Sequence, residues 1–373
     1  MFAYGPYARE IEVWADLFPE VVIAAPLRLE APPGDAVVLG RPSISVAPQL
    51  ETGGDTLADK AIQVLALPRH AWRLARAMRQ ADAIHVRCPG NLGLLGCLLA
   101  PLFGKPRVAK YAGQWSDYPG QPRSWGWQKA LLRSRWWRGL VLVYGRWPNQ
   151  PPQVVPFFAS VMDDAQMTRA RSALPRDWPT PALEVLFVGR LSGQKNVDVI
   201  LRALALLKQE GLCPRLRVVG DGPMRRELEA LARGLNLDQQ VSFHGAVPQT
   251  KVLDFYEQAH ILVLASQTEG WPKAIAEAMA FGLVCIGANR GLVPQMLGEG
   301  RGLVVEPGDV AALAARLRQA ATDASEAAGM SERAAAWASQ FTLEAFKAAL
   351  RQRLESSWNA PLAVRLNVGP EKT

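Results

Sequence analysis

The chain has 373 residues, of which 49% are hydrophobic and 20% charged, a composition that suits two globular domains and excludes a disordered chain. Its 42 Lys and Arg outnumber its 34 Asp and Glu, and the net charge of +8 favours anionic partners such as phosphate-bearing substrates, anionic lipid or nucleic acid. We find no uncharged apolar run of about 18 residues and no signal peptide, so we expect a cytoplasmic chain without a membrane-spanning helix.

The first half alternates short apolar runs with segments of helical apolar spacing. This pattern predicts strands over 21–25, 83–86 and 107–111, and helices over 61–78, 92–103 and 128–144. The chain begins almost at a loop, so we expect its first strand to be missing or very short. Gly5 is the candidate glycine of that loop.

One segment of this half, residues 123–147, is basic and rich in tryptophan. It holds six Lys or Arg, five Trp and no acidic side chain. Trp and Arg together favour the surface of an anionic bilayer, although a nucleic-acid surface uses the same residue types. An ordinary helix whose Trp side chains lie in the core is the other interpretation.

Residues 167–180 contain two prolines and several charges without a strand pattern, so we predict a linker there. Beyond it the alternation is clearer, with strands predicted over 185–188, 216–219, 241–243, 261–264, 284–286 and 302–305. Helices are predicted over 197–210, 223–235, 251–259, 273–281 and 311–321. Strands separated by helices predict a parallel sheet, whose ligands bind beyond the carboxyl ends of the strands.

Four cysteines occur, each in or beside an apolar run: Cys88, Cys97, Cys213 and Cys285. There is no CxxC pair, and no Cys or His partner lies at zinc-ligand spacing. We therefore expect buried thiols in a reducing compartment, with neither a disulfide nor a metal site.

The loop after the strand at 185–188 is the first candidate site. Gly189 opens the backbone to a ligand, and Arg190 and Lys195 supply two cations on one short loop, as a diphosphate requires. The helix that begins near residue 197 would add its positive end. A solvated basic turn is the alternative.

Two further turns follow strands in the same way. Gly222 lies in the sequence Val-Gly-Asp-Gly-Pro, which is also a generic turn between a strand and a helix. His244 lies at the end of the next strand, where it faces a ligand or has only a structural role.

The strongest segment runs from residue 268 to residue 282. Glu277 lies two turns into a helix among alanines, where its carboxylate is a natural acceptor for a ribose diol, and Glu269 precedes that helix. Glu269 could accept bonds from a hexose or stabilise positive charge at its anomeric carbon. The alternative makes Glu269 a helix-start carboxylate and Glu277 a surface charge. The start of the helix is a candidate anion site formed by Gly270, Trp271, Pro272, Lys273 and Ala274.

Glu269 and Glu277, with seven residues between them, resemble the EX7E motif of retaining GT-B glycosyltransferases. The whole stretch 185–321 resembles the catalytic domain of glycosyltransferase family 4, also called group 1. Five segments carry the resemblance in chain order: Gly189-Arg190-Leu191 with Lys195-Asn196, Gly220-Asp221-Gly222-Pro223, Phe243-His244-Gly245, residues 269–280, and Glu306-Pro307-Gly308-Asp309.

The resemblance implies a GT-B fold of the α/β class, with two Rossmann-like domains facing a central cleft. We place an N-terminal acceptor-binding domain at 1–166 and a C-terminal nucleotide-sugar-binding domain at 181–341. A helix at 342–360 would cross back to the N-terminal domain. Transfer with retention at the anomeric carbon and without a metal ion is also implied.

The resemblance further assigns roles to single residues. Arg190 and Lys195 would hold the donor diphosphate, and Glu269 with the backbone of 270–273 would face the donor sugar. Glu277 would bind the ribose hydroxyls, and the loop at His244 would border the base. Glu269, Arg190 and Lys195 are thus the predicted catalytic residues.

The N-terminal half departs from the family pattern at one candidate position. Many relatives carry a His after the strand that corresponds to residues 84–86, and Arg87 occupies or neighbours that place here. An Arg there faces a phosphate or an acidic sugar, or else is a loop side chain in solvent.

These observations predict a retaining glycosyltransferase of the hexosyltransferase type. Its donor would be a nucleotide-diphosphate sugar, a UDP- or GDP-sugar, and no other cofactor is expected. Its acceptor would be a hydroxyl of a glycan or of a lipid-linked molecule in bacterial surface polysaccharide biosynthesis. The enzyme would lie in the cytoplasm or peripherally on the inner face of the cell membrane.

Three alternatives compete with this prediction. The first is a non-catalytic glycosyltransferase-like subunit, against which the intact Glu269, Glu277, Arg190 and Lys195 argue. A nucleic-acid-binding protein would account for the charge but for neither glutamate, so we expect no nucleic-acid partner. An epimerase or phosphorylase of the same architecture is the third, but the chain is short for a phosphorylase and has no pyridoxal-binding lysine motif.

Overall fold

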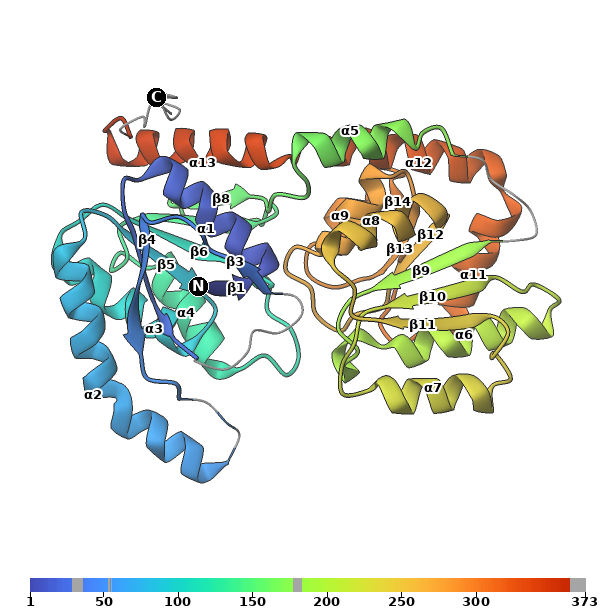
Figure 1. The fold of residues 1–373 in the computed structure, drawn as a ribbon, viewed down its shortest axis with the longest axis horizontal. Helices are drawn as coiled ribbons and strands as arrows, with labels where there is room; N and C mark the ends of the chain where they lie inside the picture. Colours follow the sequence, from blue (N-terminus) through green and yellow to red (C-terminus); the bar gives the residue numbers. More distant parts are fainter. Residues whose placement is uncertain (29–35, 53, 55, 177–182, 363–373) are drawn as a thin grey trace, which may run out of the picture. The chain divides into compact units, whose positions relative to one another are not determined.

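The computed structural model describes residues 1–28, 36–52, 54, 56–176 and 183–362 (Figure 1). The chain divides into two compact units. Unit 1 comprises Met1–Phe157 with Lys347–Thr373, and unit 2 comprises Phe158–Phe346. Each unit contains a parallel sheet with helices packed around it, as the alternation of apolar runs and helical segments predicts.

The main sheet of unit 1 has four parallel strands in the order β5-β6-β7-β8. The middle strands are almost wholly buried, so they appear in the sequence as continuous apolar runs. The four strands are β5 (Ile84–Cys88), β6 (Arg107–Tyr111), β7 (Leu140–Tyr144) and β8 (Val154–Phe157).

Two smaller strand pairs complete the strands of unit 1. The predicted strand at 21–25 is β2 (Val21–Pro26), which pairs in parallel with β4 (Ile44–Gln49). The first strand is very short, as expected: β1 (Phe2–Tyr4) pairs with β3 (Ala36–Val38) in antiparallel register. Gly5 does not lie in a loop, because it is the first residue of helix α1 (Gly5–Leu17).

Helices α2 (Leu57–Gln80), α3 (Asn91–Leu99) and α4 (Arg123–Arg133), with the short turn η1 (Ala100–Phe103), pack in sequence beside one another. The prediction of one helix over 128–144 is wrong, because α4 ends at Arg133 and the run from 140 to 144 is strand β7. A short continuous apolar run fits a buried strand and a buried helix equally well, so periodicity alone did not distinguish them.

Unit 2 is built on a six-stranded parallel sheet in the order β11-β10-β9-β12-β13-β14. All six strands lie where the sequence predicts them. They are β9 (Glu184–Val188), β10 (Arg215–Val219), β11 (Val241–Gly245), β12 (Ile261–Leu264), β13 (Val284–Ala288) and β14 (Gly302–Val305).

The helices of unit 2 connect these strands. Helix α6 (Val197–Gln209) packs against α11 (Val310–Thr322), and α9 (Lys273–Ala280) packs against α12 (Ala324–Ala338). The remaining helices are α5 (Asp164–Ser172), α7 (Arg225–Gly234), α8 (Gln249–Gln258) and α10 (Val293–Leu297). Helices α5, α10 and α12 were not predicted.

The predicted linker at 167–180 is wrong in its first part. Residues up to Ser172 belong to helix α5, which Asp163 caps by accepting a hydrogen bond from the backbone N–H of Gln166. Met167 is buried on this helix, and Arg169 forms ion pairs with the carboxylates of Asp254 and Glu257. Residues 177–182 lie outside the described residues.

The last described helix, α13 (Leu343–Trp358), lies within the range 342–360 predicted for a terminal helix. Its first residues belong to unit 2, and from Lys347 onward it belongs to unit 1, where the ammonium group of Lys347 lies 2.6 Å from Asp16 Oδ2. The observed units meet at Phe157–Phe158 and Phe346–Lys347, whereas the boundaries at 1–166, 181–341 and 342–360 stay a prediction.

Three thiols are buried, as expected, but Cys213 is exposed, and all four cysteines are free. In the described part of the chain, no group of three or more His, Cys, Asp or Glu side chains has the arrangement of a metal site. No described helix has the length and apolar composition that crossing a bilayer requires.

Candidate active site

The connectivity of the unit 2 sheet has a switch point between β9 and β12. From β9 the chain adds β10 and β11 on one side, and from β12 it adds β13 and β14 on the other. Helices that leave such neighbouring strands diverge, and ligands of open parallel sheets bind beyond the carboxyl ends there. We therefore expect a ligand site at the loops that follow β9 and β12.

The loop after β9 lies against the loop after β10. The backbone N–H of Gly189 donates to the carbonyl of Val219 at 3.0 Å, and that of Leu191 donates to the carbonyl of Asp221 at 2.9 Å. Gly220 has a φ of +131°, and a Cβ atom on it would lie 1.9 Å from the Gly189 carbonyl oxygen. Glycine is therefore required at position 220.

The same loop is also fixed to the segment after β12. Asn196 has a left-handed backbone (φ +49°), and its side-chain amide donates to the carbonyl of Ala265 at 2.8 Å. The backbone N–H of Gln267 donates to the carbonyl of Gln194 at 2.8 Å. These two bonds hold the loops of the switch point together.

Lys195 and Glu269, two predicted catalytic residues, meet at this place. Lys195 Nζ lies 2.5 Å from Glu269 Oε1. Glu269 is buried, and the Lys195 side chain is 26% exposed. An ammonium group has three donors, so Lys195 can serve an anion while it stays paired with Glu269.

Arg190, the third predicted catalytic residue, lies on the same loop and is exposed. Within the described part of the chain, we find no hydrogen bond or ion pair of its side chain. Arg190 is therefore a cation available to solvent or ligand beside the switch point. It lies one residue beyond Gly189, which follows β9 directly.

Glu277 is buried on α9, so the interpretation as a surface charge is wrong. The hydroxyl of Tyr256 donates to its Oε2 at 2.9 Å, and the Gln249 amide donates to its Oε1 at 3.3 Å. Burial, and then the Glu277 carboxylate, raise the pKa of Tyr256, which keeps the phenol protonated as a donor. A carboxylate accepts about four hydrogen bonds, more than these two donors supply.

The start of α9 offers mainly backbone groups to the candidate site. The ring of Trp271 stacks on Trp337, with ring centres 6.1 Å apart, and packs edge-on against Phe341. Pro272 caps the helix, and its carbonyl accepts from the backbone N–H groups of residues 275 and 276. A ligand contact by Trp271 would therefore use its backbone. Gly270, Lys273 and Ala274 are half-buried around this start.

Gly222 lies in the loop after β10, and His244 lies on β11. A Cβ atom on Gly222 would lie 2.3 Å from the Leu191 carbonyl oxygen, so this glycine allows the loop contact described above. His244 is exposed, with Nε2 3.0 Å from the Ser242 hydroxyl and its ring edge-on to Phe255. Burial, and then Arg217, lower the pKa of His244, so its imidazole is neutral at pH 7.

The sequence interpretation missed several residues of this edge. Tyr256 and Gln249, which hold Glu277, lie on a predicted helix without any separate signal. Asn289, beyond β13, donates to Glu306 at 2.6 Å. The segment that begins with Glu306 was noticed as a motif, but its partner comes from a distant segment and carried no pattern of its own.

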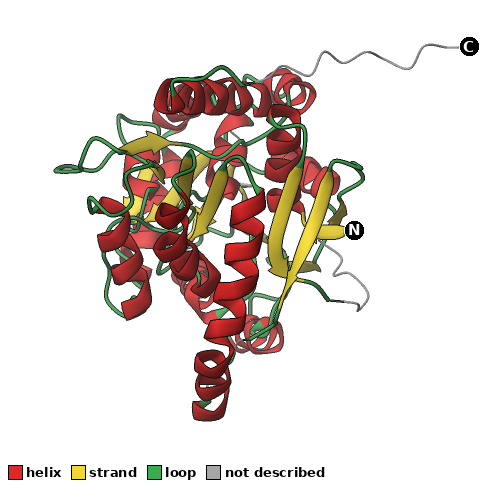
Figure 2. Cartoon of the chain, turned by 90° about the vertical axis from the view of Figure 1, so that its left-hand side faces the viewer, coloured by secondary structure: helices red, strands yellow, loops and turns green. Residues whose placement is uncertain are grey.

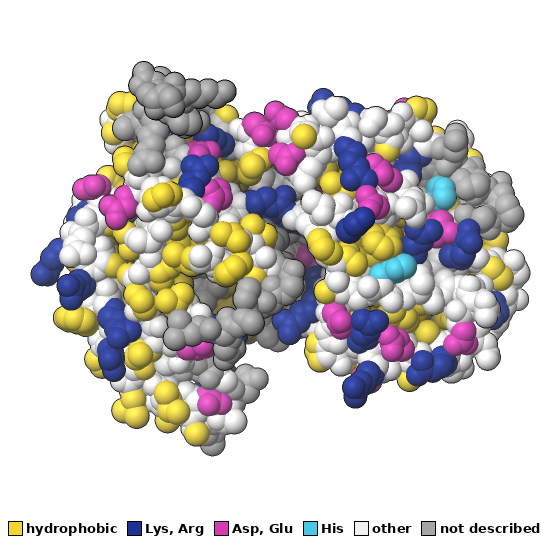
Figure 3. Space-filling view, in the orientation of Figure 1, with side chains coloured by type: hydrophobic (Ala, Val, Ile, Leu, Met, Phe, Trp, Pro, Cys, Tyr) yellow, Lys and Arg dark blue, Asp and Glu magenta, His cyan; other side chains and the backbone are white. Residues whose placement is uncertain are grey.

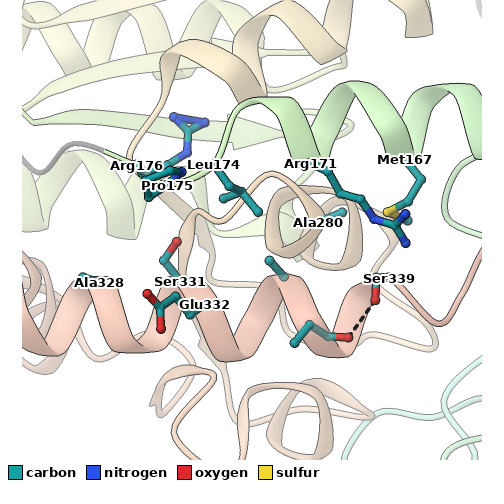
Figure 4. Close-up of a pocket in the computed structure, with 12 residues that line it drawn as sticks. Met167, Arg171, Leu174, Pro175, Arg176, Ala280, Ala328, Ser331, Glu332 and Ser339 are labelled. Carbon is teal, nitrogen blue, oxygen red and sulfur yellow. Dashed lines mark hydrogen bonds between the residues drawn. The ribbon is translucent and has the colours of Figure 1, made fainter.

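Unit 2 also has a cavity that belongs to a different place. Residues of α5, α12 and the segment after α5 line it, including Arg171, Arg176 and Glu332 (Figure 4). No predicted site residue lines this cavity. Arg176 donates to the backbone carbonyls of Phe281, Glu257 and Tyr256, so it has a structural role there.

In unit 1, Arg87 is half-buried within a charge cluster and is not a loop side chain in solvent. It lies on β5, and its Nη1 lies 2.9 Å from Glu10 Oε2. The other oxygen of Glu10 lies 2.9 Å from the ammonium group of Lys110, which is 1% exposed. Two cations against one carboxylate leave a net positive charge near the carboxyl ends of β5 and β6.

Two pKa shifts follow from this cluster. Burial raises the pKa of Glu10, but Lys110 and Arg87 outweigh it and hold that pKa well below its ordinary value. His85, stacked on Trp14 with ring centres 4.2 Å apart, has its pKa lowered to about 3 because it is buried. His85 is therefore neutral in the folded chain.

Comparison with known protein families finds a match in the part of the chain that contains the loops described above. The family model described as glycosyl transferases group 1 matches residues 175–337. The match covers less than half of the chain. It contains the loops after β9, β10, β11 and β12 and therefore all the predicted site residues of unit 2.

Two curated relatives show the extent of the similarity. The chain is 32% identical over 158 residues to the amylovoran biosynthesis glycosyltransferase AmsK of Erwinia amylovora, covering 40% of this chain and 39% of the relative. It is 36% identical over 191 residues to a D-inositol 3-phosphate glycosyltransferase of Streptomyces avermitilis, covering 48% and 40%. The chain thus matches about two fifths of the length of these relatives.

Solved structures extend the likeness to the whole fold. A sucrose-phosphate synthase from Thermosynechococcus elongatus is 22% identical, with a TM-score of 0.68 over 91% of this chain and 89% of that one. The Anabaena protein Alr3699/HepE, solved in complex with UDP, is 18% identical, with a TM-score of 0.63 over 90% and 100%. The α/β fold is therefore that of GT-B glycosyltransferases, while the predicted central cleft stays a prediction.

We predict that Gly220→Ala destabilises unit 2 by about 3 kcal/mol or more, because the new Cβ would clash with backbone and φ is positive. Gly193→Ala is the matched control, since nothing lies within 4 Å of a Cβ there and no positive φ is required. Urea unfolding followed by tryptophan fluorescence measures both variants. Equal midpoints for the two would contradict the required contact between the loops.

We predict that the titration of His85 lowers the free energy of unfolding as the pH falls. The unfolded chain binds a proton at this residue as the pH falls below the ordinary value of 6.5, whereas the folded chain does so only near a pKa of about 3. The stability that the neutral His85 contributes is fully present above pH 6.5. It is lost as the pH falls toward 3, by up to about 1.4 kcal/mol of unfolding free energy per pH unit.

His85→Phe keeps a ring against Trp14 and removes the titrating group. The loss of stability between about pH 7 and about pH 4.5 should become shallower in this variant, as measured by urea unfolding at several pH values. His244→Phe, at an exposed position, should change the profile much less. A profile identical to that of the unaltered chain in His85→Phe would show that this imidazole is not the buried neutral group inferred above.

Proposed function

We propose that the chain is a retaining glycosyltransferase of the hexosyltransferase type, which moves a sugar from a nucleotide-diphosphate sugar to a hydroxyl of a glycan or lipid-linked acceptor. The observation that carries the proposal is the meeting of Lys195 and Glu269 at the switch point, with Arg190 exposed on the same loop. This arrangement lies inside the segment that matches glycosyl transferases group 1.

The proposed roles follow the chemistry of each side chain. Arg190 and Lys195 hold the donor diphosphate, because a planar fork and a point charge together suit its oxygens. Glu277, already held by Tyr256 and Gln249, accepts from the ribose hydroxyls. Glu269 and the backbone of 270–274 face the sugar, and His244 borders the base. The donor is a co-substrate, and we propose no further cofactor or metal.

The proposed chemistry needs no protein nucleophile. The bond between the anomeric carbon and the diphosphate oxygen breaks, and the acceptor hydroxyl forms the new bond on the same face of the sugar. The hydroxyl proton passes to the departing diphosphate. Arg190 and Lys195 stabilise the negative charge that develops on the leaving group, and Glu269 stabilises the positive charge on the sugar.

The donor and the acceptor are proposed by class. Alr3699/HepE was solved with UDP and with UDP-glucose, which supports a UDP-sugar, with a GDP-sugar as the other candidate. AmsK is named for amylovoran biosynthesis, which supports a polysaccharide acceptor in surface glycan synthesis. The D-inositol 3-phosphate glycosyltransferase has a similar segment and is named for a small acceptor.

We expect UDP- or GDP-sugars, tested beside ADP- and dTDP-sugars, to raise the unfolding temperature of the chain, and one nucleotide class to do so most. Glu277→Gln should weaken this stabilisation at least tenfold in apparent affinity, because an amide accepts a diol less well than a carboxylate. Glu229→Gln, on α7 and paired with Arg225, is the matched control and should bind like the unaltered chain.

Calorimetric titration of the preferred nucleotide separates binding from folding in these variants. Donor binding without sugar transfer to any acceptor extract would favour the non-catalytic subunit. No binding of any nucleotide sugar by a folded chain would contradict the donor site itself.

Retention gives an independent prediction. When the acceptor is known, the product should carry the same anomeric configuration as the donor, as read from the proton coupling constant of the anomeric centre by NMR. Lys195→Met should lower kcat by about a hundredfold or more, because the charge of the leaving diphosphate is then uncompensated. An inverted product would rule out the proposed same-face transfer even if the donor site is correct.

A further inference from the structure

Exposed large hydrophobic side chains gather on the helices of unit 1. Among the described residues of unit 2, only Leu206 has an exposed large hydrophobic side chain, at 37%. On α2, α3, η1, α4 and the residues just after α4 there are nine: Ile62, Val64, Leu65, Leu67, Trp72, Leu98, Leu102, Trp127 and Trp136. A concentration of exposed apolar side chains of this kind indicates an interaction surface.

Helix α2 supplies most of this surface, and its outer face has a regular pattern. Its inner face is the buried set Ala66, His70, Leu74 and Met78, spaced by four residues. The outward stripe recurs at steps of three or four residues and consists of Ile62, Leu65, Arg69, Trp72, Arg76 and Arg79. We call this set the α2 stripe. Leu65 is 80% exposed and Trp72 is 62% exposed, values that a core helix would not show.

The charge of α2 is strongly positive. Five Lys or Arg lie on it against one acid, Asp59, which is used within the N-terminal cap by Thr56. In the α2 stripe, three arginines accompany three apolar side chains and no acid interrupts them. The guanidinium of Arg76 lies over the ring of Trp72, 5.8 Å from its centre. Trp and Arg so combined favour the boundary between lipid headgroups and acyl chains.

The position of α2 makes the stripe accessible. Figures 1 and 2 show the N-terminal half of the helix extending beyond the sheet of unit 1. In Figure 3, hydrophobic and basic side chains lie side by side over this part of the molecule. From Ala61 to Arg69 only Ala66 is buried, so most of the helix circumference there faces solvent.

The neighbouring helices extend the surface but do not replace α2. Of the tryptophans in the segment 123–147, Trp127 is 66% exposed and Trp136 is 44% exposed, whereas Trp137 is buried. Lys129 is buried as well and forms an ion pair with Asp117. The segment singled out by composition is therefore partly core, and the continuous basic and apolar face belongs to α2.

We propose that the α2 stripe binds the surface of an anionic phospholipid bilayer, with α2 lying in the interface plane. Leu65 and Trp72 would enter the boundary between headgroups and acyl chains, while Arg69, Arg76 and Arg79 pair with lipid phosphates. A bilayer fits better than a protein partner because the stripe alternates long cations with apolar side chains and holds no acid. The inference adds a location for a lipid-linked acceptor to the proposed function but does not depend on it.

Flotation of the full chain with vesicles tests this surface. The chain should float with vesicles that contain phosphatidylglycerol and far less with phosphatidylcholine alone, and salt should weaken the binding. Leu65→Gln with Trp72→Gln should reduce binding roughly tenfold or more. Leu206→Gln, on α6 of unit 2, is the control for loss of an exposed apolar side chain and should bind normally.

Charge is tested by a second pair of variants. Arg69→Glu with Arg79→Glu should reduce binding to anionic vesicles roughly tenfold or more. Arg226→Glu with Arg233→Glu, on α7 of unit 2, makes the same change in net charge at exposed positions and should have a much smaller effect. Equal losses in both pairs would overturn the proposal, since binding would then follow net charge alone.

Two further outcomes would also overturn it. One is that a folded chain does not float with anionic vesicles at low salt. The other is that the chain binds duplex DNA through the same arginines while Leu65→Gln with Trp72→Gln changes nothing, which would make the stripe a nucleic-acid surface. Donor titration on the same variants should be unaffected, so loss of donor binding and loss of vesicle binding are separate failures.

Discussion

The bond between the Asn196 side chain and the Ala265 carbonyl fixes the geometry on which the candidate site depends. It requires a left-handed residue at the start of α6, a conformation that Asn adopts more readily than most residues. This bond fixes the loop after β9 to the segment after β12, so both loops have defined positions at the carboxyl end of the sheet. The contact of Gly220 with Gly189 fixes the other side of the same loop.

Both units place charged side chains at the carboxyl ends of their parallel strands, but the two sites differ in exposure. In unit 2, Lys195 keeps a quarter of its side chain accessible while it pairs with Glu269. In unit 1, Lys110 and Glu10 are nearly inaccessible, so removing one partner would leave an uncompensated buried charge. Lys195 is therefore accessible at the surface of unit 2, whereas the Glu10–Lys110 pair is part of the core of unit 1.

The strands and most helices of unit 2 could be predicted because each is a short apolar run or an amphipathic segment bounded by turn residues. The positions of Gly189, Lys195 and Glu269 in the loops after strands, and of Glu277 on a helix, could be predicted as well. The partners of Glu277 could not, because Tyr256 and Gln249 meet it only through tertiary packing. The helix predicted over 128–144 is wrong because a short continuous apolar run fits a buried strand as well as a buried helix. The exposed apolar face of α2 could not be predicted, since composition does not reveal which side of an apolar segment is covered.

The bonds from Tyr256 and Gln249 hold the Glu277 carboxylate in one rotamer before any ligand arrives. A flexible glutamate would lose rotamer entropy on binding a diol, and part of the interaction energy would be spent in ordering it. Here that cost falls on the folding of unit 2. In the proposed donor site, the carboxylate would therefore act as a rigid template, which selects ligands by the distance between two neighbouring hydroxyls more than by the mere presence of hydrogen-bond donors.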